Sequence, residues 1–288
     1  MRRHRHVALA LALASTTVFA ASRASAFEWP TAVRTERADD PIARFRWDRL
    51  SAWRSTATNE LRASLATLSS GPQDAPSLAA RAVILRLLRR DADARECLRH
   101  AREMSPERDV LDDPDVALTA AFLSAREGDF TEAASLGARA LARMPPPAPQ
   151  DALHREALTL EISRWSMARG PDGLRDAEFV LSAFASVTPA SPALRTTLAL
   201  VLSREGRVDE ARLLVAPLRG TLRPTDGDDA EMPDGALVRG ESLAATGVAL
   251  VLVGRRHDAE APLTRAATEV PAPWRSSVAS ELAAARRP

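Results

Sequence analysis

The sequence predicts an all-α protein, a right-handed superhelix of about five helical hairpins with a capping helix at each end. Apolar residues recur with helical spacing, as at Leu118, Ala121 and Phe122, and no segment shows the alternation typical of a strand. Turn residues recur at intervals of a few dozen positions, which is the spacing of repeat arrays. The stretch REGDFTEA at 126–133 also reappears as REGRVDEA at 204–211. These observations together indicate stacked copies of one hairpin.

The first 26 residues have the features of a secretory signal peptide. Three arginines within the first five residues precede an apolar stretch, and Ala24-Ser25-Ala26 predicts cleavage after Ala26. The apolar stretch is shorter than the roughly 20 residues that span a bilayer. An uncleaved anchor is the alternative. We therefore expect a periplasmic or secreted protein without an integral membrane span after cleavage.

The charge balance excludes some classes of partner. The full chain has a net charge of +1, and residues 1–26 contain four arginines and no acids, so residues 27–288 carry −3. This balance favours neither a nucleic-acid partner nor an anionic membrane surface. Cys97 is the only cysteine, so the chain forms no internal disulfide and its fold depends on its core.

Two segments are expected to cap the array. Residues 27–75 contain a helical pattern with Trp53 and Leu61 on its apolar side, ending at Gly71. We interpret them as an N-terminal cap over the first repeat, since solenoids need polar ends. A partner-binding arm is the alternative. Residues 272–288 would form the C-terminal cap helix.

The repeated stretch has the residues of a helix-turn-helix corner. Gly128 and Gly206 are expected to end one helix in the left-handed conformation, which costs glycine little. Ala133 and Ala211 are small enough for the second helix to pack closely on the first. The repeated letters therefore predict the same corner in two hairpins.

Three further corners follow the same pattern less closely. Arg89 stands where the first hairpin should have its turn glycine, and GPDG at 170–173 lengthens the third turn by about two residues. The first small residues of the second helices are 39, 44, 34 and 48 positions apart: Ala94, Ala133, Ala177, Ala211 and Ala259. Three of the four junctions therefore carry extra loop residues.

Residues 76–271 resemble the tetratricopeptide repeat (TPR), whose unit has about 34 residues with small residues, a turn glycine and a closing proline at set offsets. The clearest copy, DVALTAAFLSAREGDFTEAASLGARALARMPP, matches at Ala121, Gly128, Phe130, Ala133, Ala140 and Pro145. Two further copies match at Gly206, Val208, Ala211, Leu218 and Pro224, and at Gly247, Gly254, Ala259, Ala266 and Pro271.

The resemblance implies that the first helix of each repeat lines a concave groove. It assigns partner contacts to ten residues: Val83, Arg86, Phe122, Arg126, Arg164, Met167, Leu200, Arg204, Val248 and Val251. Arginine beside apolar side chains suits a peptide with acidic residues or a free C-terminal carboxylate. The alternative is that arginine is simply the default polar residue of a chain that contains no lysine.

The sequence gives only weak signals for a catalytic or metal site. Cys97 and His100 share a helical face, but a zinc site needs three or four ligands. The acidic loop at 225–235 lacks the ordered spacing of an EF-hand. Glu241-Ser242 resembles the acid of some peptidoglycan-cleaving enzymes, but the 47 residues that follow it are needed for the last repeat. We expect no catalytic residues, metal or cofactor.

The sequence thus predicts an exported, non-enzymatic TPR-type scaffold that binds a protein or peptide in an envelope complex. The alternative is a non-catalytic ligand-binding subunit of a cell-envelope enzyme.

Overall fold

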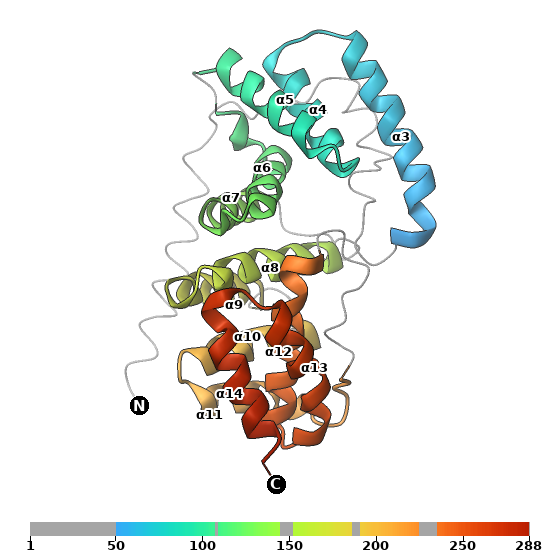
Figure 1. Cartoon of the computed structure of the whole chain (residues 1–288). Helices are drawn as coiled ribbons and strands as arrows, with labels where there is room; N and C mark the ends of the chain where they lie inside the picture. The colour runs from blue at the N-terminus through green and yellow to red at the C-terminus, as the bar shows by residue number, and fades with distance from the viewer. Residues whose placement is uncertain (1–49, 107–108, 145–151, 186–190, 225–234, 288) are drawn as a thin grey trace.

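The computed structural model describes residues 50–106, 109–144, 152–185, 191–224 and 235–287, whose regular secondary structure is entirely helical (Figure 1). The α-helices are α3 (Leu50–Ser70), α4 (Ala75–Leu87), α5 (Asp91–Met104), α6 (Pro114–Glu127), α7 (Phe130–Arg143), α8 (Ala152–Ala168), α9 (Leu174–Ala185), α10 (Pro192–Arg204), α11 (Val208–Val215), α12 (Gly235–Leu252), α13 (Arg256–Glu269) and α14 (Arg275–Ala285). Short 3₁₀ helices are η2 (Val110–Asp112), η4 (Pro171–Gly173), η5 (Ala216–Leu218) and η6 (Ala272–Trp274). The predicted signal peptide lies outside the described residues.

Neighbouring helices pack in successive pairs along the chain. Helix α4 packs on α5, α6 on α7, α8 on α9, α10 on α11, and α12 on α13 (Figure 1). Helix α3 packs on α4 at one end, and α14 packs on α13 at the other. The all-α fold class predicted from the sequence is confirmed for the described part of the chain.

Four of the corners between paired helices have the same backbone geometry. Arg89, Gly128, Gly206 and Gly254 all have positive φ, between 64° and 84°. In each corner the next N–H donates to the carbonyl five residues before it, at 2.8–3.0 Å, as in Asp129 to Ser124. This is the bond of a Schellman helix end, which satisfies carbonyls that the helix leaves free. Gly128 and Gly206 thus have the role that the repeated stretch predicts.

The second helix of each hairpin starts from the corner in a recurrent way. An alanine stands five residues after each of the four left-handed residues and is 0% exposed: Ala94, Ala133, Ala211 and Ala259. In three corners an arginine pairs with the acid three residues later, for example Arg207 with Glu210 at 2.8 Å. The offset from the left-handed residue to the buried alanine is the same in these four corners, which explains why the sequence repeats there.

The third corner is longer, as the sequence predicts. Gly170 has φ of 87°, and η4 follows it before α9 starts. Ala177, seven residues after Gly170, is again 0% exposed. The two added residues are therefore accommodated within the turn, and the small residue keeps its packing position.

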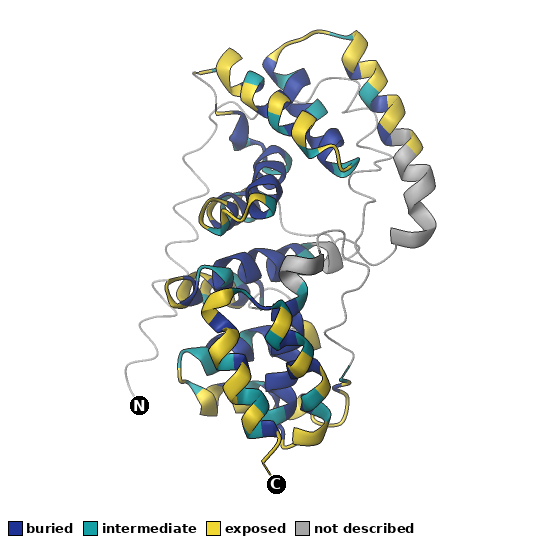
Figure 2. Cartoon of the chain, in the orientation of Figure 1, coloured by how far each residue is buried: buried dark blue, intermediate teal, exposed yellow. Residues whose placement is uncertain are grey.

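Two hydrophobic cores meet at α8. Leu158, Ile162 and Trp165 belong to the core formed with α3–α7, whereas Leu160 and Met167 belong to the core formed with α9–α14. Every residue from Leu158 to Met167 is buried, which makes α8 the dark band in the middle of Figure 2. A helix that is buried all round serves both halves of the molecule.

Helix α12 is equally enclosed. Every residue from Gly240 to Leu250 is buried, because α10, α11, α13, α14 and α8 all contact it. A side chain at Gly247 would meet Leu263 of α13 at 2.5 Å. Glycine there permits the close packing of α12 on α13.

Candidate functional site

The structure buries most of the residues predicted to line a groove. Seven of the ten are at most 9% exposed: Val83, Arg86, Phe122, Arg164, Met167, Leu200 and Val248. The side chain of Arg204 is 0% exposed, and that of Arg126 is 16% exposed and pairs with Asp91 of α5. Val251 is partly exposed. The expectation of an open groove therefore needs correction at the buried positions, while a role in partner binding stays a prediction.

The physical reason lies in contacts between helices that are distant in sequence. The Arg164 guanidinium of α8 donates to the Ser242 hydroxyl of α12 at 3.1 Å, and Trp274 of η6 donates from Nε1 to the Met167 carbonyl at 2.6 Å. These bonds bring α8, α12 and the C-terminal segment together on the side that the repeat resemblance assigns to a ligand. In the C-terminal half, residues predicted to contact a ligand thus hold helices of the chain together.

In the N-terminal half two of the predicted groove residues, Arg86 and Phe122, belong to an aromatic and cationic stack. The Arg86 guanidinium lies 4.6 Å from the Phe122 ring centroid. Phe122 meets Trp165 edge to face, with centroids 5.0 Å apart. The Trp165 indole in turn donates to the Glu161 carboxylate at 3.1 Å. Such contacts add to the apolar burial that joins α4, α6 and α8.

The C-terminal half contains four side chains that we call the Arg204 cluster: Arg204 of α10, Glu241 of α12, Trp274 of η6 and Glu281 of α14. Arg204 Nη2 lies 2.8 Å from Glu241 Oε2, and the two side chains are 0% and 1% exposed. Arg204 Cζ lies 4.1 Å from the Trp274 ring centroid. The arginine is thus paired with a carboxylate and stacked on an indole, out of contact with water.

Polar atoms in this cluster remain unsatisfied. Glu241 Oε1 and Glu281 Oε2 are buried and accept no hydrogen bond within the described part of the chain. The other oxygen of Glu281 accepts from Ser277 at 3.4 Å. Burying a carboxylate oxygen without a donor is costly, and the cost is larger for an ionised carboxylate than for a neutral carboxyl.

The pKa of Glu281 reflects this environment. Burial raises the pKa of this carboxyl from 4.5 to about 7; Arg204 and the Ser277 hydrogen bond oppose the shift, and the Glu241 carboxylate adds to it. A neutral carboxyl avoids placing a second negative charge beside Glu241.

The residues considered from the sequence for metal binding or catalysis lie in different environments in the structure. Cys97 is buried, and desolvation raises the pKa of its thiol, whereas the His100 side chain is 44% exposed and lies 3.2 Å from Glu96. Among the described residues, no three His, Cys, Asp or Glu side chains gather as metal ligands would. Most of the acidic loop, 225–234, lies outside those residues. Glu241 is enclosed and paired, so its carboxylate is not open to a sugar substrate in this conformation.

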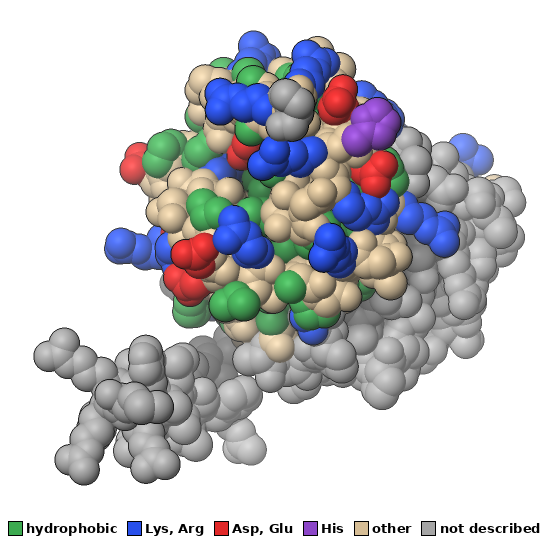
Figure 3. Space-filling view, turned by 90° about the horizontal axis from the view of Figure 1, so that it is seen from below, with side chains coloured by type: hydrophobic (Ala, Val, Ile, Leu, Met, Phe, Trp, Pro, Cys, Tyr) green, Lys and Arg blue, Asp and Glu red, His purple; other side chains and the backbone are tan. Residues whose placement is uncertain are grey.

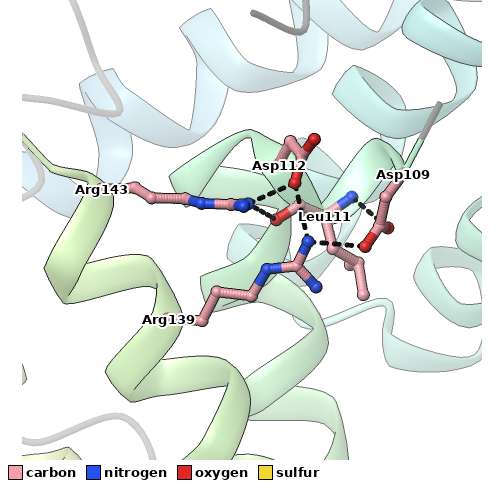
Figure 4. A network of polar contacts seen from close by, with 5 residues as sticks. All are labelled: Asp109, Leu111, Asp112, Arg139 and Arg143. Atoms are coloured by element: carbon pink, nitrogen blue, oxygen red, sulfur yellow. Dashed lines mark hydrogen bonds and ion pairs between the residues drawn. The ribbon is translucent and has the colours of Figure 1, made fainter. Parts of the chain in front are cut away.

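A second ion network joins α7 to the loop before α6. Arg139 Nη2 contacts Asp109 at 2.6 Å and Asp112 at 2.7 Å, while Arg143 pairs with Asp112 and donates to the Leu111 carbonyl (Figure 4). These side chains are 33–45% exposed. The network holds η2 against α7, which is where the first extra loop of the array lies.

Within the described part of the chain, few large apolar side chains are exposed. Phe179 of α9 is 71% exposed and Leu213 of α11 is 76% exposed; Met104 and Val208 are exposed to a lesser degree. Figure 3 shows basic side chains spread over the C-terminal end among acidic and apolar ones. This face does not form a single block of positive charge.

Sequence reasoning missed two members of the Arg204 cluster. Trp274 and Glu281 were assigned only to a capping segment, because nothing in helical periodicity relates them to α10 or α12. A tryptophan in a stretch with no other large apolar side chain, APWRSS at 272–277, is the signal that could have indicated an anchor.

Comparison with protein-family models gives no match, and no curated protein matches the sequence. None of the described helices is both long enough and apolar enough to cross a bilayer.

Proposed function

We propose that this chain is an exported, non-enzymatic scaffold of the TPR type, a superhelix of about five hairpins that binds a partner protein or peptide. The observation that carries the proposal is the recurrent corner: a left-handed residue, a Schellman bond, and a fully buried alanine five residues later. Helical repeats of this kind build extended surfaces, and repeat proteins use such surfaces to bind partners.

We propose that the partner protein or peptide contacts the second helices of two hairpins, α9 and α11. The inner positions are used for packing, whereas Phe179 and Leu213 expose most of their apolar surface to water. Arg175, one turn before Phe179 on α9, is exposed as well. A partner segment with an apolar residue followed by an acidic one would complement this surface, because the apolar side chain can pack on Phe179 and the carboxylate can pair with Arg175.

The test is a binding experiment with matched variants. Immobilised residues 27–288 are exposed to envelope extract at low and moderate salt, and retained proteins are identified by mass spectrometry. The test variant is Phe179→Ser with Leu213→Ser. The control is Met104→Ser, which removes an apolar side chain that is 56% exposed on the distant helix α5.

We expect one protein, retained in stoichiometric amount by the unchanged chain and by the control, to be lost from the double variant while thermal stability is unchanged. Equal retention by the double variant would remove α9 and α11 as the binding surface. Retention of no protein would contradict the scaffold proposal and direct attention to cell-wall fragments as ligands.

A further inference from the structure

The C-terminal segment, residues 271–285, closes over the Arg204–Glu241 pair. Its anchor is Trp274, which is 6% exposed, stacks on Arg204 and donates to the Met167 carbonyl. Pro273 lies against Gly170, where an added Cβ would be 3.3 Å from it. Glu281, two turns further along α14, is held over the same pair with its Oε2 atom buried.

The charges under this segment balance when one of the two carboxyls is protonated, and the 2.8 Å contact between Arg204 and Glu241 favours Glu281 as the protonated one. Arg204 supplies one positive charge, and Glu241 and Glu281 would supply two negative charges if both were ionised. Arg164 lies 3.9 Å from Glu161, and these two residues add one charge of each sign, so they leave the sum unchanged. A protonated Glu281 makes the cluster neutral and brings an O–H donor to a site where carboxylate oxygens lack donors.

We propose that residues 271–285 form a pH-sensitive latch, in which α14 stays docked while Glu281 is neutral and is released when Glu281 ionises. Release would expose Trp274, Arg204 and Glu241 to solvent.

The direction follows from proton linkage. The carboxyl of Glu281 has a pKa of about 7 when α14 is docked and its ordinary value of 4.5 when the side chain is exposed to water. The docked state therefore binds the extra proton between these values, and docking weakens as the pH rises through that window. Below pH 4.5 the docking of α14 is most favourable, and above about pH 7 it is least favourable and no longer changes with pH. Between pH 5.5 and 8 the opening equilibrium should rise on the order of 20-fold.

Other charged groups also face α14. From α10 and α12 these are Arg204 and Glu241. From α13, Glu260 lies 3.8 Å from Arg286 just beyond α14, and His257 lies 3.7 Å from Glu260. Histidine is the side chain that most often titrates near neutral pH, so His257 is the competing explanation and provides the control.

The experiment is hydrogen–deuterium exchange of the α14 amides between pH 5.5 and 8, corrected for the intrinsic pH dependence of exchange. It compares the unchanged chain with Glu281→Gln and His257→Gln, and uses α6 and α7 amides as the internal reference. Glutamine keeps the shape of glutamate and cannot ionise.

We expect α14 protection to fall with pH in the unchanged chain and in His257→Gln, and to stay constant in Glu281→Gln. A constant profile in the unchanged chain overturns the proposal, and this result does not depend on the folding of any variant. A fall that persists in Glu281→Gln, or disappears in His257→Gln, also overturns it.

Discussion

The guanidinium of Arg204 and the carboxylate of Glu241 lie 2.8 Å apart, and their side chains are 0% and 1% exposed. This pair joins α10 to α12 in the interior, beneath the indole of Trp274. A buried ion pair contributes modestly while intact, because desolvation offsets most of the attraction between its charges. Removing one partner has a larger effect, since a charge is then left buried alone.

Glu241→Leu is therefore expected to lower the free energy of unfolding by about 3 kcal/mol, because Arg204 loses its counter-charge. Arg204→Met with Glu241→Leu should lose less than the sum of the two single variants, since no charge is then left unpaired. Urea denaturation of the four proteins measures the coupling between the sites. Strict additivity would show that the pair does not couple α10 to α12.

Arg89 is the one described residue other than glycine with positive φ, at 64°. Arg89→Gly should raise the free energy of unfolding by up to about 1 kcal/mol, because glycine adopts this conformation without a steric penalty. Gly206→Ala should lower it by about 1 kcal/mol, since an added Cβ there meets nothing within 4 Å and the cost is conformational.

The control for these turns is Gly220→Ala, where a Cβ also meets nothing and φ is not in the left-handed region. Its free energy of unfolding should change little. If Gly206→Ala matches this control in chemical denaturation, the left-handed turn is not what selects glycine in the corner.

Asp112 is the centre of the network with Arg139 and Arg143. Burial acts to raise the pKa of its carboxyl, but the two arginines outweigh this and hold the pKa below its ordinary value of 3.8. The ion pairs therefore stabilise the fold above that value and lose their contribution as the pH falls below it. Because the side chains are partly exposed, Asp112→Ala should cost less than about 1 kcal/mol, and less again at high salt.

The measurement is thermal denaturation of Asp112→Ala at low and high salt. Asp209→Ala is the control, since Asp209 is 94% exposed and pairs with Arg212 on its own helix. If the loss of thermal stability in Asp112→Ala is the same at low and high salt, the effect comes from the packing of η2 and not from the ion pairs.

Cys97 should react slowly with thiol reagents in the folded protein. Its side chain is buried and desolvation raises the pKa of the thiol, so little nucleophilic thiolate is exposed near neutral pH. Absorbance assays with a disulfide reagent should show one equivalent reacting rapidly only after denaturation. Rapid reaction in native buffer would show that α5 opens readily.

The corners were predictable because their chemistry is local. The positive φ of Gly128 and the burial of Ala133 depend on neighbouring residues that recur at a fixed offset in the sequence. The left-handed conformation of Arg89 was not predicted, since arginine itself gives no such signal and the pattern only marked its position as that of the missing turn glycine.

The closed interior could not be predicted in the same way. Met167 and Trp274 are separated by 107 positions, and Arg164 and Ser242 by 78. No periodic pattern reports contacts between helices so far apart in the chain. The family resemblance suggested an open groove, but in this chain Arg164 and Met167 of α8 bond to α12 and to the C-terminal segment.

Helix α8 determines how the molecule can lose its structure. Leu158, Ile162 and Trp165 complete one core while Leu160 and Met167 complete the other. A fragment that ends before α8 would lack part of its interior, and a fragment that begins there would expose the same side chains to water. Neither half is self-sufficient, so heating should give a single cooperative transition instead of two independent ones.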